Sequence, residues 1–239
     1  MNVRRLALVA WVLLLALVPS ACKKLKARDQ LNKGVNAFRN AQFQPAVNYF
    51  QQAVSNDPDL LNARLYLATA YAQQYIPGGD SPENVKFGEQ AISTFRQVLD
   101  RDPNNTTAIA SIAQIYYNMK KFDQAKEFQR RRMGLEPNNP EPHYWIGVID
   151  WAVCYQRDGQ LRKDLRLDVP DAKGELRPLP ETERAQLAEQ NNALVEEGIK
   201  ALKKAKIIKG LTNVAAWVLD LHYRSSFAKV YVPAVAAAT

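Results

Sequence analysis

The stretch AISTFRQVLDRDP at residues 91–103 has two counterparts elsewhere in the chain. They are AVNYFQQAVSNDP at residues 46–58 and AKEFQRRRMGLEP at residues 125–137. In each copy an alanine precedes a proline by twelve residues, and the interval from Ala91 to Ala125 is 34 residues. A fixed period of this length is the signature of stacked supersecondary units. The sequence therefore predicts an array of similar units.

Each copy is predicted to be the second helix of a helix pair. The proline at its end follows an acidic residue and stops the helix, because proline cannot donate the next hydrogen bond. A small residue lets this helix lie close to the first helix, and an aromatic residue one turn later fills the space between units. The residues at these positions are Ala46, Ala91, Ala125, Phe50 and Phe95. The first helices are predicted near residues 31–38, 65–71 and 109–117.

This pattern resembles the tetratricopeptide repeat, a helix–turn–helix unit of about 34 residues. The resemblance is strong over residues 27–155 and weak over residues 182–224. It is best over residues 106–139, although Gln129 and Arg132 depart from the pattern there. The matching residues are Gly34, Phe38, Phe43, Ala46, Phe50, Ala53, Pro58, Ala113, Tyr116, Phe122, Ala125 and Pro137. The resemblance implies an all-α fold, a right-handed superhelical solenoid of antiparallel helix pairs over residues 29–228. The implied units are about 27–60, 61–105, 106–139 and 140–210, with a partial fifth unit at 211–228.

Two insertions separate helices within the predicted pairs. The first is the stretch YIPGGDSP at residues 75–82, whose turn-forming residues break the helix. The second is a mostly polar insert at residues 156–183, in which a short hairpin and a loop are equally compatible with the sequence. A long helix is predicted at residues 182–208. The apolar tail, residues 229–239, is expected either to pack back on the last groove or to meet a partner.

The chain begins with the features of an export signal. Arg4 and Arg5 precede an apolar run at residues 6–18, which is shorter than the roughly 20 residues that cross a membrane. The sequence Pro19-Ser20-Ala21-Cys22 then resembles a bacterial lipoprotein signal, although the family usually has an aliphatic residue in the place of Pro19. The resemblance implies that residues 1–21 are removed and that Cys22 is lipidated. A plain secretory signal and an uncleaved anchor are the alternatives.

Removal of the signal would leave a chain that starts with a short basic tether, residues 22–28. The formal charge of +8 would fall to +6, because the signal contains two arginines and no acid. Lys23 after the cysteine resembles the pattern of lipoproteins sorted to the outer membrane, which implies a protein anchored there and facing the periplasm. A lipid on Cys22 would leave Cys154 without a partner for an internal disulfide.

The composition and the motifs argue against an enzyme. The chain has 239 residues, of which 47% are hydrophobic and 23% charged, with 2 cysteines, and this excludes collagen-like and disulfide-stapled classes. The candidate catalytic or metal-binding residues are Cys154, His143 and His222. Cys154 lies in an apolar run, where a buried inert thiol is expected. We therefore expect no catalytic residue, no cofactor, no metal and no nucleic acid.

A binding groove on the first helices is the main functional hypothesis. The solenoid that the resemblance implies would line its concave side with one face of each first helix. Its residues would be Leu31, Val35, Phe38, Leu65, Thr69, Gln73, Ala110, Gln114, Tyr117, Asn118, Tyr144, Val148 and Trp151. Such an apolar and aromatic surface suits an amphipathic helix or an extended apolar segment of a cell-envelope protein. The alternative is that the large aromatic residues pack within the core.

Two rival hypotheses belong to other functional classes. Lys200, Lys203 and Lys204 share one face of the last long helix and could bind a membrane surface or a polyanion. A solvated helix face explains these lysines equally well. An enzyme that depends on the insert at residues 156–183 is the third hypothesis.

Overall fold

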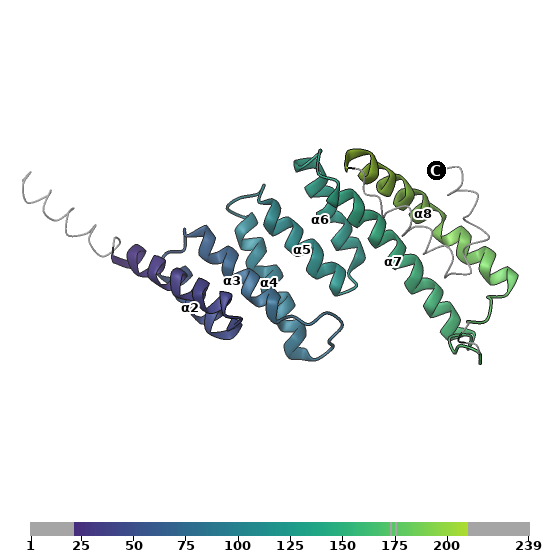
Figure 1. Cartoon of the computed structure of the whole chain (residues 1–239), viewed down its shortest axis with the longest axis horizontal. Coiled ribbons are helices and arrows are strands. Elements are labelled where there is room, and N and C mark those ends of the chain that lie inside the picture. Colours follow the sequence, from purple (N-terminus) through teal and green to yellow (C-terminus); the bar gives the residue numbers. More distant parts are fainter. Residues whose placement is uncertain (1–21, 173, 175, 210–239) are drawn as a thin grey trace, which may run out of the picture. The chain divides into compact units, whose positions relative to one another are not determined.

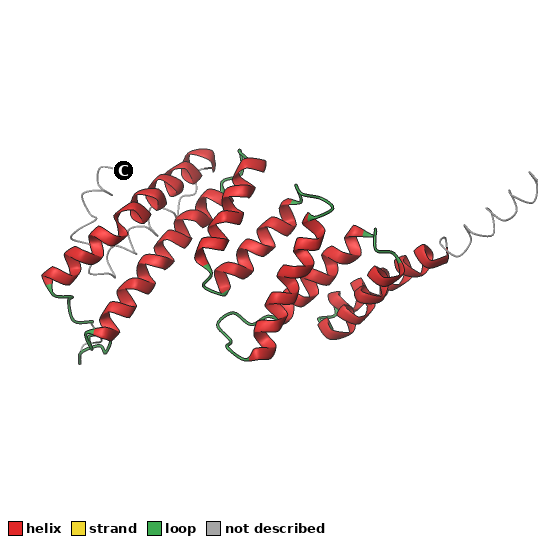
Figure 2. Ribbon diagram, turned by 180° about the vertical axis from the view of Figure 1, so that it is seen from behind, coloured by secondary structure: helices red, strands yellow, loops and turns green. Residues whose placement is uncertain are grey.

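The computed structural model describes residues 22–172, 174 and 176–209 (Figure 1). These residues form helices joined by turns and loops, without a strand (Figure 2), so the predicted all-α fold class is confirmed. None of the helices in this part of the chain is long and apolar enough to cross a membrane. The predicted signal at residues 1–21, the fifth unit at 211–228 and the tail at 229–239 lie outside the described residues.

The chain divides into two compact units, and the division falls between Met119 and Lys120. The boundary lies in the turn between the two helices of the predicted unit at residues 106–139. We call the residues up to Met119 unit 1 and the residues from Lys120 onward unit 2.

Unit 1 is built from helices that follow one another through short turns. Residues 22–39 are helical and are followed by α2 (Phe43–Asn56), α3 (Leu61–Gln74), α4 (Pro82–Leu99) and α5 (Thr106–Asn118). Each labelled helix packs on the next one, and α3 also contacts α5. The predicted first helices are thus confirmed. The predicted tether at residues 22–28 is instead part of the first helix.

The repeated small and aromatic residues form the core of unit 1. Ala46, Ala91 and Phe50 are completely buried, and Phe95 is 1% exposed. A Cβ atom on Gly34 would lie 2.4 Å from the ring of Phe50, so a glycine is needed where these two helices meet. The spacing of the repeat therefore translates directly into close contact between helices.

The first insertion is an ordered loop held by one asparagine. The side chain of Asn84, in the first turn of α4, accepts a hydrogen bond from the Ile76 N–H at 2.6 Å. It also donates to the carbonyl oxygens of Ile76 and Gly79, both at 2.8 Å. Ser81 caps α4 by accepting the Asn84 N–H at 3.2 Å. The buried side chain of Asn84 thus holds Ile76 and Gly79 of the insertion against the first turn of α4.

Unit 2 contains α6 (Phe122–Leu135), α7 (Glu141–Asp164) and α8 (Glu181–Lys209). The insert predicted at residues 156–183 begins too early, because α7 continues to Asp164. The long helix predicted at residues 182–208 is confirmed as α8, which begins at Glu181. The irregular segment is residues 165–180, and its described part contains no strand. Most of the extra length of this repeat is therefore taken up by longer helices.

Glycines bring α7 and α8 close together. A Cβ atom on Gly147 would lie 2.4 Å from the side chain of Leu202, and one on Gly198 would lie 3.3 Å from Asp150 Cβ. The segment that joins the two helices is bound to α7 by the buried Arg162, which donates to the Arg177 carbonyl at 2.7 Å. These contacts make the long pair α7–α8 one packed body.

Candidate partner-binding surfaces

The predicted groove residues of α3 and α5 lie on helices that contact each other. Leu65 and Thr69 are half-buried and Gln73 is exposed, and spacings of four residues keep them on one face of α3. On α5, Gln114, Tyr117 and Asn118 are all half-buried. Both sets therefore offer part of their surface to solvent, as a binding surface requires.

The polar groups of this surface are largely used within their own helices. The Thr69 hydroxyl donates to the Leu65 carbonyl at 2.9 Å, and Gln114 Nε2 donates to Asn118 Oδ1 at 3.2 Å. Gln73 forms no side-chain hydrogen bond with the described residues. The surface thus combines apolar area with few available donors, which suits an apolar ligand with sparse polar contacts.

The groove residues of the first helix are divided between packing and exposure. Leu31, Val35 and Phe38 are half-buried. The ring of Phe38 packs edge-on against Phe43, with 5.4 Å between the ring centres. Phe38 therefore packs the first helix against α2, while part of its ring stays accessible. Core packing thus explains part of this side chain, which the sequence assigned to the groove.

On α7 the predicted residues have different surroundings. Tyr144 and Trp151 are half-buried, whereas Val148 is only 4% exposed and belongs to the core of unit 2. The ring of Trp151 contacts that of Tyr155 at 5.3 Å between centres, and Tyr155 is 63% exposed. Sequence reasoning included Val148, which offers no surface in this conformation, and missed Tyr155, one turn beyond Trp151.

The most polar interior site was not anticipated from the sequence. Lys126 of α6 is 7% exposed, and its ammonium group bonds to the carboxylate of Asp150 of α7, which is 2% exposed. The same ammonium lies 2.9 Å from Glu197 of α8, which also binds Arg130 at 2.6 Å. We call Lys126, Asp150, Glu197 and Arg130 the charge cluster. It ties together the three helices of unit 2.

The two carboxylates of the charge cluster have opposite pKa shifts. Burial raises the pKa of Asp150 to about 6, although the hydrogen bond and the charge of Lys126 oppose this. Burial would also raise the pKa of Glu197, but its bonds to Lys126 and Arg130 hold that pKa below the usual value. Asp150 is the only acid in the apolar run at residues 144–155, and this was the signal that could have identified a buried ion pair.

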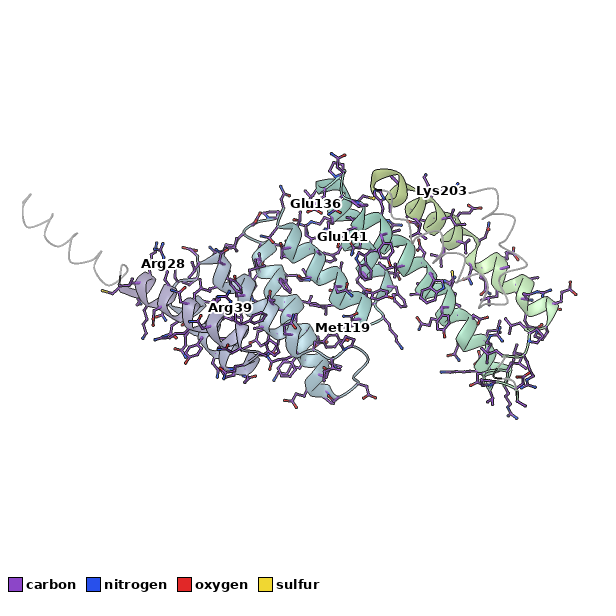
Figure 3. The ribbon with its side chains drawn as sticks, in the orientation of Figure 1. Arg28, Arg39, Met119, Glu136, Glu141 and Lys203 are labelled. Atoms are coloured by element: carbon purple, nitrogen blue, oxygen red, sulfur yellow. The ribbon has the colours of Figure 1, made fainter. Side chains whose placement is uncertain are left out.

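The two departures from the repeat pattern have different surroundings. Arg132 of α6 binds Glu136 at 2.8 Å and Glu141 at 2.6 Å, so it joins the two sides of the turn between α6 and α7. Figure 3 labels Glu136 and Glu141 close to each other beside α6 and α7. Gln129 is 3% exposed and lies in the interior of unit 2. Arg132 therefore stabilises the turn between α6 and α7.

The three lysines of α8 are exposed, whereas the candidate reactive residues Cys154 and His143 are buried. Lys200, Lys203 and Lys204 are exposed on α8, where Figure 3 marks Lys203. Cys154 is buried, and burial raises the pKa of its thiol to about 11, the opposite of what an activated nucleophile needs. His143 is 4% exposed, and burial, aided by the charge of Lys204, lowers its pKa.

The remaining candidates are residues that could bind a metal ion and the predicted lipidation site, Cys22. His222 lies outside the described residues. Within residues 22–172, 174 and 176–209, no three His, Cys, Asp or Glu side chains are grouped so that they could hold a metal ion. Cys22 is exposed and unpaired with Cys154.

Comparisons with known proteins agree with this helix-pair architecture. Residues 88–145 match the family model of the tetratricopeptide repeat. A stretch of 115 residues is 25% identical to Hsp70-Hsp90 organizing protein 3 of Arabidopsis thaliana and 25% identical to Hsp70-Hsp90 organizing protein of Triticum aestivum. Each alignment covers 48% of this chain but only 19% and 18% of those two proteins.

A solved structure extends the likeness to most of the chain. MamA from Desulfovibrio magneticus RS-1, residues 41 to the end, superposes with a TM-score of 0.56 and is 14% identical. The superposition covers 89% of this chain and 93% of that structure, and it shows the fold alone. The stretch that matches the family model, residues 88–145, contains the predicted unit at residues 106–139. The chain thus has a tetratricopeptide-type helix-pair fold, and residues 88–145 carry the sequence pattern of that repeat.

Proposed function

We propose that the protein is a non-catalytic scaffold that binds a partner protein through the exposed faces of its first helices. The observation that carries this proposal is the half-exposed apolar and amide surface of α3 and α5 in unit 1. Its polar groups are mostly satisfied within the helices, so an apolar helix or strand could cover it without leaving buried donors unpaired. Relatives that are named organizing proteins for Hsp70 and Hsp90 support the same class of function.

The second part of the proposal concerns location. The run at residues 6–18 and the sequence before Cys22 support export and a lipid anchor on a bacterial membrane, with the solenoid facing the periplasm. The exposed side chain of Cys22 is accessible for modification. Labelling of cells with a fatty acid that carries a chemical tag tests this point, because the wild type should incorporate the tag and Cys22→Ser should not.

Crosslinked capture from native membranes tests the binding surface. The comparison is between the wild type and a variant with Tyr117→Ala and Trp151→Ala, after circular dichroism has shown that the variant is folded. We expect the wild type to capture one defined envelope protein and the variant to lose it. Equal capture by both forms would place the binding site elsewhere on the chain.

A second candidate function rests on the exposure of Lys200, Lys203 and Lys204 on α8. None of the three forms an ion pair with a described residue, so this face could bind a polyanion or an anionic membrane. Salt distinguishes the candidates, because raising the ionic strength should release a polyanion and leave an apolar complex largely intact.

A further inference from the structure

The first helix of unit 1 becomes part of the packed core very close to Cys22. Residues 22–26 are all exposed, whereas Ala27 is completely buried and Ala37 is 6% exposed. At about 1.5 Å per residue, Ala27 lies only about 8 Å along the helix from Cys22. An anchor at Cys22 would therefore hold unit 1 directly against the bilayer, with no flexible spacer.

The exposed residues 22–26 and 28 of this helix combine positive charge with apolar surface. Leu25 is 73% exposed, which makes it the most exposed large hydrophobic side chain among the described residues. The first acid is Asp29, and it is bound by Lys33 at 2.7 Å. The basic side chains around Leu25 are Lys23, Lys24, Lys26 and Arg28, and none forms an ion pair with a described residue. We call residues 23–28 the basic stub.

Asp59, an acid outside this helix on which Lys24 acts, does not neutralise the basic stub. The pKa of Asp59, in the turn between α2 and α3, is lowered mainly by the hydrogen bond and charge of Arg101. Lys24 contributes a smaller electrostatic effect, so it lies near this turn. Because Asp59 is already bound by Arg101, the basic side chains remain available to an external anion.

We propose that the basic stub is a membrane-contact surface that seats Leu25 in an anionic bilayer and pairs its basic side chains with anionic headgroups. The proposal rests on the membrane attachment proposed above, because a lipid on Cys22 or an uncleaved anchor at residues 6–18 would place the basic stub at the lipid surface. Basic and apolar side chains together favour the interface of anionic membranes. After cleavage, anionic headgroups would also offset the unfavourable positive charge in the first turn of the helix.

A fluorescent probe at residue 25 tests this contact in the whole chain. The protein is isolated from bacterial membranes as the cells process it and is reconstituted into vesicles of phosphatidylglycerol with phosphatidylethanolamine, or of phosphatidylcholine alone. An environment-sensitive dye is attached to Leu25→Cys, and mass spectrometry verifies single labelling, because Cys154 is buried and a lipid on Cys22 blocks its thiol. The matched control is Ile76→Cys, which is 68% exposed and lies beyond the opposite end of α3 from Asp59. Flotation of the vesicles reports attachment independently.

We expect a blue shift of the dye at residue 25 on anionic vesicles, no shift at residue 76, and loss of the shift when Lys23, Lys24 and Lys26 are changed to Gln. If the protein floats with the vesicles but the dye at residue 25 stays in water, this proposal is overturned and the anchor stands. An equal shift on phosphatidylcholine would overturn the role of charge. A shift that requires an added soluble protein and no lipid would identify an acidic protein as the occupant instead. Failure to float would overturn the membrane attachment itself, and this proposal with it.

Discussion

The two units use the same repeat position in opposite ways. In unit 1 the residue after the first alanine of the second helix is Val47 or Ile92, and both side chains are buried. In unit 2 the same position is Lys126, which is equally buried but pairs with Asp150. A repeat can therefore keep its backbone while one apolar contact is replaced by an ion pair. The consequence is that the stability of unit 2 should depend on the ionisation of a buried carboxylate, Asp150.

The largest effect is expected from removing an aromatic residue of the repeat in unit 1. Phe50→Ala should lower the free energy of unfolding of unit 1 by about 3–5 kcal/mol, because the ring is completely buried against Gly34. Hydrogen exchange measured by mass spectrometry resolves each unit separately, which a single melting curve does not. Tyr66→Ala is the control, since Tyr66 stacks on Phe50 but is 39% exposed and should matter less. Equal losses from the two changes would contradict the packing account.

Removing the cation of the charge cluster should come next. Lys126→Met should destabilise unit 2 by about 3 kcal/mol at pH 7.5, because it leaves the buried Asp150 carboxylate without a partner. The loss should shrink near pH 5. The folded-state pKa of Asp150 already lies at about 6, above its usual 3.8, so stability falls as the pH rises through that pKa and the carboxylate ionises.

Two further variants sharpen this test. Lys203→Met, an exposed lysine on α8, should change stability by less than about 0.5 kcal/mol at either pH. Lys126→Met combined with Asp150→Leu should recover most of the loss, because an apolar pair can replace a buried ion pair. A loss that is the same at pH 7.5 and pH 5 would refute the role given to Asp150.

The close contact between α7 and α8 predicts a smaller effect. Gly147→Ala should cost about 1–3 kcal/mol, because its Cβ would lie 2.4 Å from the Leu202 side chain. Gly134→Ala on α6 has no neighbour within 4 Å of the new Cβ and should instead stabilise the helix by up to about 1 kcal/mol. Exchange rates of α8 amides measure the difference. If both changes stabilised unit 2, the two helices would be farther apart than described.

The smallest effect concerns the loop between α3 and α4. Asn84→Ala should cost about 1–2 kcal/mol, confined to residues 75–81, because the loop loses the hydrogen bonds to Ile76 and Gly79. Faster exchange of the Ile76 amide would report this directly. The exposed Asn62→Ala on α3 provides the comparison and should leave the loop unchanged. An unchanged Ile76 amide in Asn84→Ala would mean that other contacts hold the loop.

The features that sequence predicts well are those that neighbouring residues determine. One short stretch predicts a helix, its packing face and its end from Ala46, Phe50 and Pro58. The structure confirms this helix and the burial of Ala46 and Phe50. The partners in the charge cluster are far apart in sequence, since Lys126 and Glu197 are separated by 71 residues. No local pattern indicates such a pair, apart from the lone acid Asp150.

The end of α7 and the helical state of residues 22–28 were not predicted. The polar composition of residues 156–164 suggested an insert, yet they continue α7, because Asp158 and Arg162 are one turn apart and pair with each other at 2.8 Å. The basic residues 22–28 likewise suggested a tether but are helical, since Ala27 packs into the core. For the candidate binding surface, the residues that spacing selects on α3 and α5 are half-buried or exposed, but spacing could not reveal that Val148 is buried.

The measurement that tests the proposed function most directly is photocrosslinking from single positions in unit 1. A photoreactive amino acid is placed at Gln73 on α3, a first helix, or at Ser93 on α4, a second helix, and both positions are exposed. The account predicts that position 73 crosslinks to one defined protein in living cells and that position 93 does not. Crosslinking of that protein from position 93 alone would contradict a binding surface on the first helices.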